Sequence, residues 1–382
     1  MKPKLTWLEA QGLRRTRRTV EGHEGSWLNI SGKNHLAFAS NDYLGLSGHP
    51  DLVSAAHQAL DQYGVGAGAS ALVSGHSILV SRLETALASW LDFERALHFS
   101  TGYMANMGAI QAMVDGDADV FSDALNHASL IDGIRLSRPR STTIYPHLGM
   151  DDLENALLQS TAREKWIISD AVFSMDGDLA PLPVLVDLCH RHGARLMLDD
   201  AHGFGVLGHE GKGSLDHWGI RARDFPGLYM ATLGKAAGVF GAFVAGSDED
   251  MEWLMQRSRT YIFTTGTPPV LAAAALAALD HIRKDEYRRE HIRKLGKQLQ
   301  SGLKSLPWKV PESVTAIHPV VVGDNVSTMK LAEALWHQGL WVPAIRPPTV
   351  PPGTARLRIS LSALHQPEQV KALLEVLGMV AA

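Results

Sequence analysis

Short apolar runs alternate with amphipathic segments along the middle of the chain, from about residue 70 to residue 246. β-Branched and aromatic residues are frequent in the short runs, which predicts strands. The intervening segments carry apolar residues at three- and four-residue spacing, which predicts helices that pack one face onto a sheet. This alternation is typical of an α/β domain with a mostly parallel sheet. The clearest strands are expected at residues 97–100, 119–123, 166–173 and 194–202, with two more within residues 228–246.

Two helices in this block have recognisable sequence signals. Residues 77–91 carry the apolar three- and four-residue repeat along their whole length. A second helix, at residues 181–193, opens with Pro181 and Pro183 and closes on Gly193. Proline near the first turn and glycine just past the last are the preferred residues at those positions.

The composition changes near residue 280, where residues 281–300 predict a long charged helix acting as a lever between domains. Strands expected at residues 315–324, 341–345 and 355–361 then alternate with helices at 330–340 and 367–380, as in a small α+β layer. We therefore expect three parts: an N-terminal arm at 1–43, a large α/β domain at 44–280 and a C-terminal α+β domain at 281–382.

Composition narrows the class of partner. A chain of 382 residues with 45% hydrophobic residues can bury a sizeable core, and a net charge of −4 argues against a general nucleic-acid binder. Cys189 is the single cysteine, which fits a reducing compartment. The longest apolar run, residues 270–279, stops at Asp280, so we expect neither a signal peptide nor a membrane span. The expectation is a cytoplasmic protein acting on small molecules.

Four arginines stand close together near the start, at positions 14, 15, 17 and 18. They suit a transit peptide or a polybasic patch, but Glu9, Glu21 and Glu24 dilute the charge. We favour a solvated helix for this segment.

Candidate chemistry is concentrated behind two predicted strands. Asp199 and His202 close one strand, and Lys235 closes a later one. Ligands of open α/β sheets bind outside the carboxyl ends of strands, so both segments face one crevice. A desolvated lysine there can form a Schiff base with an aldehyde. A carboxylate such as that of Asp199 can keep the ring nitrogen of pyridoxal phosphate protonated, which that electron sink requires.

Each of these signals is weak when taken alone. A Gly-Lys pair after a strand is usually a turn with a solvated lysine. The Asp-Asp-Ala-His segment at 199–202 could equally be a metal pair or a satisfied hydrogen-bond network. No further cluster of His and Asp stands out among the 18 histidines, so we expect no metal site.

Two more segments add specificity. Ser100 to Tyr103 follows a strand and opens a helix, where free backbone N–H groups could hold a phosphate near Gly102, or where Ser100 or Thr101 simply caps the helix. His127 follows the next strand, where its imidazole could stack on a planar ring and the hydroxyl of Ser129 could cap a helix. A lone histidine in such a place is more often structural.

The chain resembles the α-oxoamine synthases, pyridoxal-phosphate enzymes of fold type I, from about residue 40 to residue 364. The segments SNDYLGLSGHP, GAGASALVSGHS, STGYMANMG, DALNHASLIDG, VFSMDGDLAPL, DDAHGFGVLG and TLGKAAG match the family pattern in order. The resemblance implies an acyltransferase with pyridoxal 5′-phosphate as cofactor. It also implies a large domain with a mostly parallel sheet, a small C-terminal domain and an N-terminal arm.

By this resemblance Lys235 would hold the cofactor covalently and Asp199 would pair with its ring nitrogen. His202 and Ser174 would hydrogen-bond the ring hydroxyl oxygen, and His127 would stack on the ring. The phosphate would be bound by the last group of residues, which are Gly102, Tyr103, Thr232 and, from a second subunit, Thr265. That last contact implies a homodimer with shared sites.

The resemblance also assigns the substrate contacts. Asn41 and Arg358 would bind the carboxylate of the amino acid, and Arg356, on the same strand face, competes with Arg358 for that role. The segment at residues 344–358 looks most like the biotin-pathway member of the family, which would condense L-alanine with pimeloyl-CoA or a pimeloyl-acyl-carrier protein and release CO2 and free carrier thiol. Arg15 and Thr349 would then contact the acyl chain or the product.

The sequence departs from the family pattern at two places. The glycine-rich stretch at residues 66–71 has alanines where the family often has serine, glycine and a larger polar residue, and Gly266 replaces a small hydroxyl residue that is common after Thr265. Other activities on the same scaffold stay open: glycine acylation, transamination, or a cofactor-binding regulatory subunit without turnover.

Overall fold

The computed structural model describes residues 1–381, which form two compact units. Among the described residues, the terminal unit comprises Met1–Gly45, Ser174–Asp178 and residues 287–381, and the central unit comprises Leu46–Phe173 and Leu179–Glu286. The three parts expected from the sequence, 1–43, 44–280 and 281–382, divide the chain differently and stay a prediction. The compact units group both ends of the chain together and carry the central unit on to residue 286.

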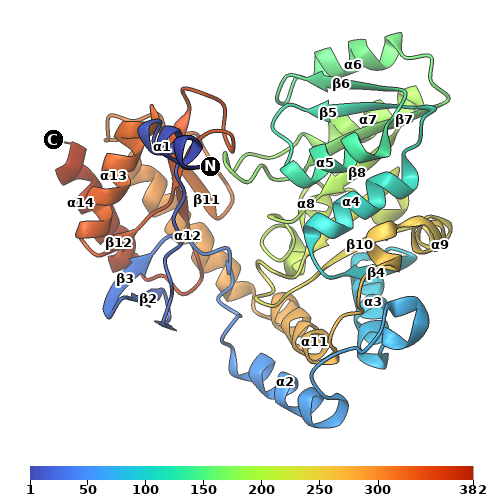
Figure 1. The fold of residues 1–382 in the computed structure, drawn as a ribbon, viewed down its shortest axis with the longest axis horizontal. Helices are drawn as coiled ribbons and strands as arrows, with labels where there is room; N and C mark the ends of the chain where they lie inside the picture. The colour runs from blue at the N-terminus through green and yellow to red at the C-terminus, as the bar shows by residue number, and fades with distance from the viewer. Residues whose placement is uncertain (382) are drawn as a thin grey trace. The chain divides into compact units, whose positions relative to one another are not determined.

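A seven-stranded sheet forms the middle of the central unit (Figure 1). Its strand order is β4-β10-β9-β8-β7-β5-β6, and only β10 runs antiparallel to its neighbours. The expected mostly parallel sheet is therefore confirmed. Its strands are β4 (Arg95–Phe99), β5 (Ala118–Asp123), β6 (Ser141–Tyr145), β7 (Glu164–Asp170), β8 (Arg195–Asp199), β9 (Gly227–Thr232) and β10 (Ala242–Gly246).

Helices join these strands and cover the sheet. As expected, α7 ends at His192 with Gly193 in the left-handed conformation, and α3 begins after Ser77, whose hydroxyl accepts a hydrogen bond from the Val80 N–H. The helices of this unit are α2 (Pro50–Tyr63), α3 (Ile78–Leu91), α4 (Gly102–Met113), α5 (Ala128–Ser137), α6 (Met150–Gln159), α7 (Leu182–His192), α8 (Ser214–His217), α9 (Asp248–Arg257), α10 (Arg259–Ile262) and α11 (Pro269–Lys284), with short turns of other helix types at Ala71–Gly75, His209–Gly211 and Ala222–Asp224.

Small residues let α4 approach the sheet closely. Ala105 and Ala109 are fully buried against the core that includes Ile168 and Met197. On another side of the helix, a Cβ on Gly108 would lie 2.2 Å from the Thr260 hydroxyl of α10, so this glycine allows α10 to pack closely. This close packing fixes the first turn of α4 beside the sheet edge.

The terminal unit contains two smaller sheets. In one, strands β1, β2 and β3 are antiparallel and β12 joins β3 in parallel, and in the other β14 lies antiparallel between β11 and β13. Its elements are α1 (Lys2–Ala10), β1 (Gly22–Glu24), β2 (Trp27–Ile30), β3 (Lys33–Ala37), α12 (Glu286–Leu303, of which residue 286 belongs to the central unit), β11 (Ile317–Gly323), α13 (Asn325–His337), β12 (Leu340–Trp341), β13 (Ala344–Ile345), β14 (Ala355–Ser360) and α14 (Pro367–Ala381).

Three local expectations are wrong. The charged segment near residue 280 is two helices separated at Asp285, and α12 buries a face that includes Arg289, Ile292 and Leu299. The second helix is therefore partly buried, whereas the sequence favoured a lever between domains over a buried element. Residues 341–345 enter two different sheets, because Pro343 lacks the N–H needed to continue a ladder. The arginines at 14–18 follow α1 without forming a helix.

No helix among residues 1–381 combines the length and apolar character needed to cross a bilayer.

Candidate active site

The candidate catalytic residues of the central unit follow the carboxyl ends of its parallel strands. His127 follows β5, Asp170 and Asp199 end β7 and β8, and Lys235 follows β9. Since β7, β8 and β9 are adjacent and parallel, these ends share one edge of the sheet. The sequence placed the ligand crevice at this edge, and the structure assembles the residues there.

Lys235 and His202 are in direct contact. The Lys235 Nζ lies 2.8 Å from the His202 Nε2, although the two residues are 33 positions apart. The imidazole is buried and the lysine is half-buried. The amine is thus held by a neighbour that can exchange a proton with it, as a nucleophilic lysine requires.

Asp199 is a buried carboxylate whose recorded donors within residues 1–381 are all neutral. Its Oδ2 accepts a hydrogen bond from Asn106 Nδ2 at 2.7 Å, and its Oδ1 accepts one from the Ala201 N–H at 2.9 Å. Only 4% of Asp199 is exposed. A buried charge of this kind calls for a cationic partner, which a protonated ring nitrogen would supply.

The next carboxylate along the chain, that of Asp200, has a different role. It accepts hydrogen bonds from Ser214 N, Ser214 Oγ and Tyr229 OH, at 2.5–2.7 Å. Burial raises the pKa of Asp200 to about 6, against the opposing effect of these donors. These hydrogen bonds engage both carboxylate oxygens of Asp200 with structural donors.

A chain of polar groups links His127 to Asp199. The His127 Nδ1 lies 2.7 Å from Ser129 Oγ, and Asn106 Nδ2 donates to that same Oγ at 2.8 Å as well as to Asp199. Desolvation lowers the pKa of His127 and so favours the neutral ring, while the charge of Asp199 opposes this shift. His127 as a whole is exposed, so its ring is accessible to a planar ligand.

Sequence reasoning missed Asn106, Ser129 as a link in this chain, and Asp170. The Asp170 Oδ2 accepts a hydrogen bond from the His127 N–H at 2.7 Å, and burial together with the charge of Asp199 raises the pKa of Asp170. Asn106 is a polar residue on the buried face of an otherwise apolar helix, and that sequence signal could have revealed it.

The first turn of α4 forms the candidate phosphate site. Thr101 is the N-cap and accepts from the Met104 N–H at 3.2 Å, which leaves the N–H groups of Gly102 and Tyr103 outside the helical ladder. A Cβ on Gly102 would lie 3.9 Å from the Cβ of Thr232, so these two expected phosphate contacts are neighbours. The Thr232 hydroxyl donates to the Gly241 carbonyl oxygen at 3.0 Å.

Thr265 is exposed on the central unit and forms an isolated β-bridge with Ser70. Its expected reach into a second subunit stays a prediction. The presence of glycine at the next position has a steric explanation. A Cβ on Gly266 would lie 2.4 Å from the Gly75 carbonyl oxygen. This part of the chain therefore excludes the hydroxyl residue common in the family.

Arg358 lies on β14, and Asn41 and Ser174 belong to other segments of the same terminal unit. Its guanidinium donates to the Ser174 carbonyl oxygen at 2.5 Å, Asn41 Oδ1 at 3.1 Å and Ser360 Oγ at 2.8 Å. The fourth recorded acceptor is the Tyr43 hydroxyl at 3.3 Å. All of these acceptors are neutral, and Arg358 is 5% exposed. The buried cation is held in position but is not neutralised by them.

Arg356, the competing residue, already has an anionic partner. Its guanidinium pairs with the Asp176 carboxylate and donates to the Met175 and Thr354 carbonyl oxygens. It is therefore less suited than Arg358 to bind a free carboxylate.

Arg15 and Thr349, both expected at the acyl chain, meet in the terminal unit. The Arg15 Nη2 donates to Thr349 Oγ1 at 3.4 Å, across 334 residues of sequence. Arg346 lies near Arg15. The pKa of Arg346 is lowered mainly by burial and further by the positive charge of Arg15. Two arginines and a hydroxyl gathered in this way suit an anionic group.

Comparison with known proteins agrees with this geometry. The family model described as aminotransferase class I and II matches residues 33–377. The chain belongs to this family. An 8-amino-7-oxononanoate synthase 1 from Polaromonas sp. is 52% identical over 99% of this chain and 95% of its own length, and the synthase from Herminiimonas arsenicoxydans is 52% identical over 98% and 97%. The resemblance to the α-oxoamine synthases is thus confirmed.

Solved structures of the family share the fold. A serine palmitoyltransferase from S. paucimobilis, with bound pyridoxal phosphate and myriocin, is 28% identical, with a TM-score of 0.94 over 100% of this chain and 97% of that one. The 8-amino-7-oxononanoate synthase from Francisella tularensis is 27% identical, with a TM-score of 0.79 over 91% and 97%. The expected fold type I class is confirmed.

Proposed function

We propose that the chain condenses L-alanine with a pimeloyl thioester to give 8-amino-7-oxononanoate, CO2 and free carrier thiol, in biotin biosynthesis, with pyridoxal 5′-phosphate as cofactor. The observation that carries the chemistry is the Lys235–His202 contact together with the buried carboxylate of Asp199, which accepts hydrogen bonds from two neutral donors. Relatives about 52% identical over nearly the whole chain, which bear the synthase name, support the choice of substrates.

The residues present fit this cofactor. When bound, pyridoxal phosphate supplies an electron sink for the negative charge that develops at the α-carbon of the amino acid. Lys235 would attach the cofactor, remove the alanine Cα proton once displaced, and return a proton after CO2 leaves. Asp199 would keep the ring nitrogen protonated, His202 and Ser174 would bind the ring hydroxyl oxygen, and His127 would stack on the ring.

The remaining binding roles are part of the same proposal. The N–H groups of Gly102 and Tyr103, with the Thr232 hydroxyl, would bind the phosphate, and the partner copy would add Thr265. A homodimer and a cytoplasmic location are proposed on the same basis. Asn41 with Arg358 would bind the alanine carboxylate, and Arg15 with Thr349 would contact the acyl end.

We expect Arg358→Gln to raise the KM for L-alanine by about 10–100-fold, because a hydrogen bond to a charged group contributes about 1.5–3 kcal/mol. The matched variant is Arg356→Gln, on the same strand face. It should chiefly lower the thermal midpoint by breaking the contact with Asp176, with a smaller change in KM. Steady-state kinetics with varied alanine measure both. If Arg356→Gln raised the KM for L-alanine more than Arg358→Gln did, Arg356 and not Arg358 would be assigned to the alanine carboxylate.

Arg15→Gln should raise the KM for pimeloyl-CoA by about threefold to fivefold, since an exposed ion pair contributes up to about 1 kcal/mol. The KM for heptanoyl-CoA, which lacks the distal carboxylate, should not change. Arg14→Gln is the control, because Arg14 pairs with Glu9 at 2.9 Å instead. If Arg15→Gln raised the KM for both thioesters equally, Arg15 would not bind the distal carboxylate.

The function itself is tested by offering alanine, glycine or serine with acetyl-, pimeloyl- or palmitoyl-CoA and measuring released thiol and CO2. The proposal predicts the highest kcat/KM for alanine with pimeloyl-CoA. Glycine with acetyl-CoA as the best pair would instead indicate another α-oxoamine synthase. Conversion of the cofactor to pyridoxamine phosphate by alanine alone would indicate an aminotransferase.

A further inference from the structure

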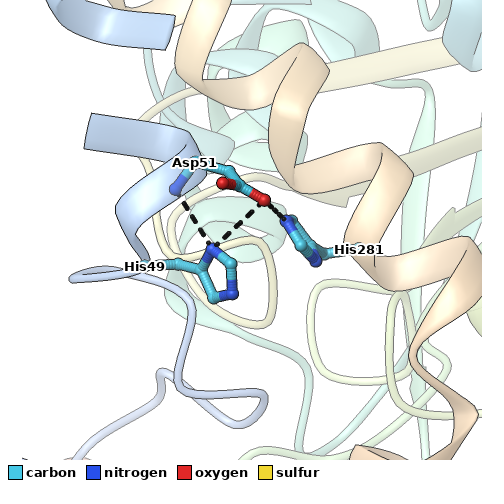
Figure 2. A group of neighbouring side chains, drawn as sticks. All are labelled: His49, Asp51 and His281. Atoms are coloured by element: carbon cyan, nitrogen blue, oxygen red, sulfur yellow. Dashed lines mark hydrogen bonds and ion pairs between the residues drawn. The ribbon is translucent and has the colours of Figure 1, made fainter. Parts of the chain in front are cut away.

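Two histidines and an aspartate converge in the central unit, on elements other than those that carry Lys235, His202 and Asp199 (Figure 2). His49 precedes α2, Asp51 lies in its first turn, and His281 lies near the end of α11. One candidate ligand atom from each residue lies within 4.8 Å of the other two. The two helices pack side by side, so the cluster joins segments 230 residues apart.

The contacts around the cluster bring three possible ligand atoms together. His281 Nδ1 lies 3.0 Å from Asp285 Oδ2, and its Nε2 lies 2.9 Å from Asp51 Oδ2. In the tautomer that carries its proton on Nδ1, the ring donates to Asp285 and presents the Nε2 lone pair toward Asp51. His49 Nδ1 lies 3.9 Å from Asp51 Oδ2 and accepts the Asp51 N–H at 3.3 Å, a long hydrogen bond that a bound metal would replace. A cation among these three atoms would bind the Asp51 carboxylate and the two imidazoles together.

We propose that His49, Asp51 and His281 bind a divalent transition metal of the zinc type, with Asp285 orienting His281. Imidazole nitrogen and carboxylate oxygen are common zinc ligands at about 2.0–2.2 Å, which puts tetrahedral ligand atoms about 3.4 Å apart. The observed separations of 2.9 Å and 3.9 Å from Asp51 Oδ2 bracket this value, and the third separation, between the two imidazole nitrogens, is at most 4.8 Å. A carboxylate behind a ligating histidine is the usual second partner in such sites.

The exposure of the cluster indicates what kind of site it is. The Asp51 side chain is 68% exposed, while those of His49 and His281 are about 20% exposed, at 20% and 19%. The two imidazoles are therefore positioned by packing, and the carboxylate faces solvent, where water completes the coordination. Such a metal would fasten the start of α2 to the last turn of α11. The alternative occupant is a proton on His281, which would make the cluster a simple ion-pair contact.

Binding of Zn²⁺ to chelator-treated holoenzyme, measured by calorimetry, tests the proposal. Wild type should bind with saturation, and the bound metal should raise the thermal midpoint by about 2–4 °C at a hundredfold excess over Kd. His49→Ala and His281→Ala should each abolish that metal-dependent rise, and Asp285→Asn should weaken binding by about 10–100-fold. Because each variant is compared with and without metal, any general loss of stability does not affect the result.

His337→Ala is the matched control, since this exposed histidine also pairs with a carboxylate, Glu333, at 3.3 Å. It should leave binding unchanged. Co²⁺ gives a second readout, because histidine coordination produces visible bands in a difference spectrum, and these should be lost in His281→Ala. The proposal is overturned if wild type shows no saturable binding, or if the His49→Ala and His281→Ala proteins bind as wild type does.

Discussion

Lys235→Ala is expected to abolish covalent attachment of pyridoxal phosphate and to lower turnover by on the order of 10⁴-fold, the upper range for loss of a positioned proton-transfer group. The amine is the attachment point and, once released, the group placed to move the Cα proton. Its Nζ lies 2.8 Å from the His202 Nε2. The Lys235→Ala substitution removes this amine and therefore both of its roles. Borohydride reduction followed by mass analysis of the peptide containing position 235 measures the attachment.

Two further variants serve as controls: one tests whether positive charge alone at position 235 is sufficient, and the other tests whether loss of any partly buried lysine has the same effect. Lys235→Arg keeps a cation next to His202 but cannot form the covalent link, so it should be as inactive as the alanine variant. Lys212→Ala is the matched control, because Lys212 is also a partly buried lysine of the central unit, paired with Asp92 at 3.2 Å. Covalent labelling that persists in Lys235→Ala would assign the attachment to another lysine.

Asp199→Asn should lower turnover by about 10- to 1000-fold while the fold is retained. A carboxylate in contact raises the pKa of a cationic partner by about 1–3 units, and each unit lost is a tenfold loss of the protonated ring at neutral pH. The effect should therefore shrink as the pH is lowered, because acid restores the proton. The pH profile of kcat, with the absorption spectrum of the bound cofactor, measures this.

The surroundings of Asp199 explain why its asparagine variant should fold. Asn106 Oδ1 is buried without a hydrogen-bond partner, so the Asn106 amide can turn and accept a hydrogen bond from the amide that the substitution introduces at position 199. Asp200→Asn is the control: it should lower the thermal midpoint by disturbing the bonds to Ser214 and Tyr229, but leave the cofactor spectrum unchanged. A near-normal rate and pH profile in Asp199→Asn would show that the acid is misassigned.

The parallel sheet and its ligand edge could be predicted because hydrophobic periodicity is a local signal, and strands that alternate with helices form a mostly parallel sheet. Lys235, Asp199 and His127 each follow a buried strand, and parallel strands bring such positions together whatever lies between them. Two long-range pairs that were named from the resemblance, Arg15 with Thr349 and Asn41 with Arg358, also meet within the terminal unit.

The rest depended on packing that no local pattern records. Asn106 looks like an ordinary helix residue until its amide is seen between Ser129 and Asp199. The His49, Asp51 and His281 cluster could not be found from the sequence because His281 lies 230 residues from Asp51, so the three residues show no regular ligand spacing. The break at Asp285 was hidden by continuous helical propensity on both sides.

The terminal unit is built from the two ends of the chain, and this has a consequence for synthesis. Strand β3 pairs with β12, so the sheet of the first 45 residues is completed by a strand translated some three hundred residues later. During translation, strand β3 has an unpaired edge until β12 has been synthesised. The central unit can fold as soon as residue 286 has left the ribosome. A ribosome that stalls between these points would release a chain with a folded middle and an unprotected sheet edge at its beginning.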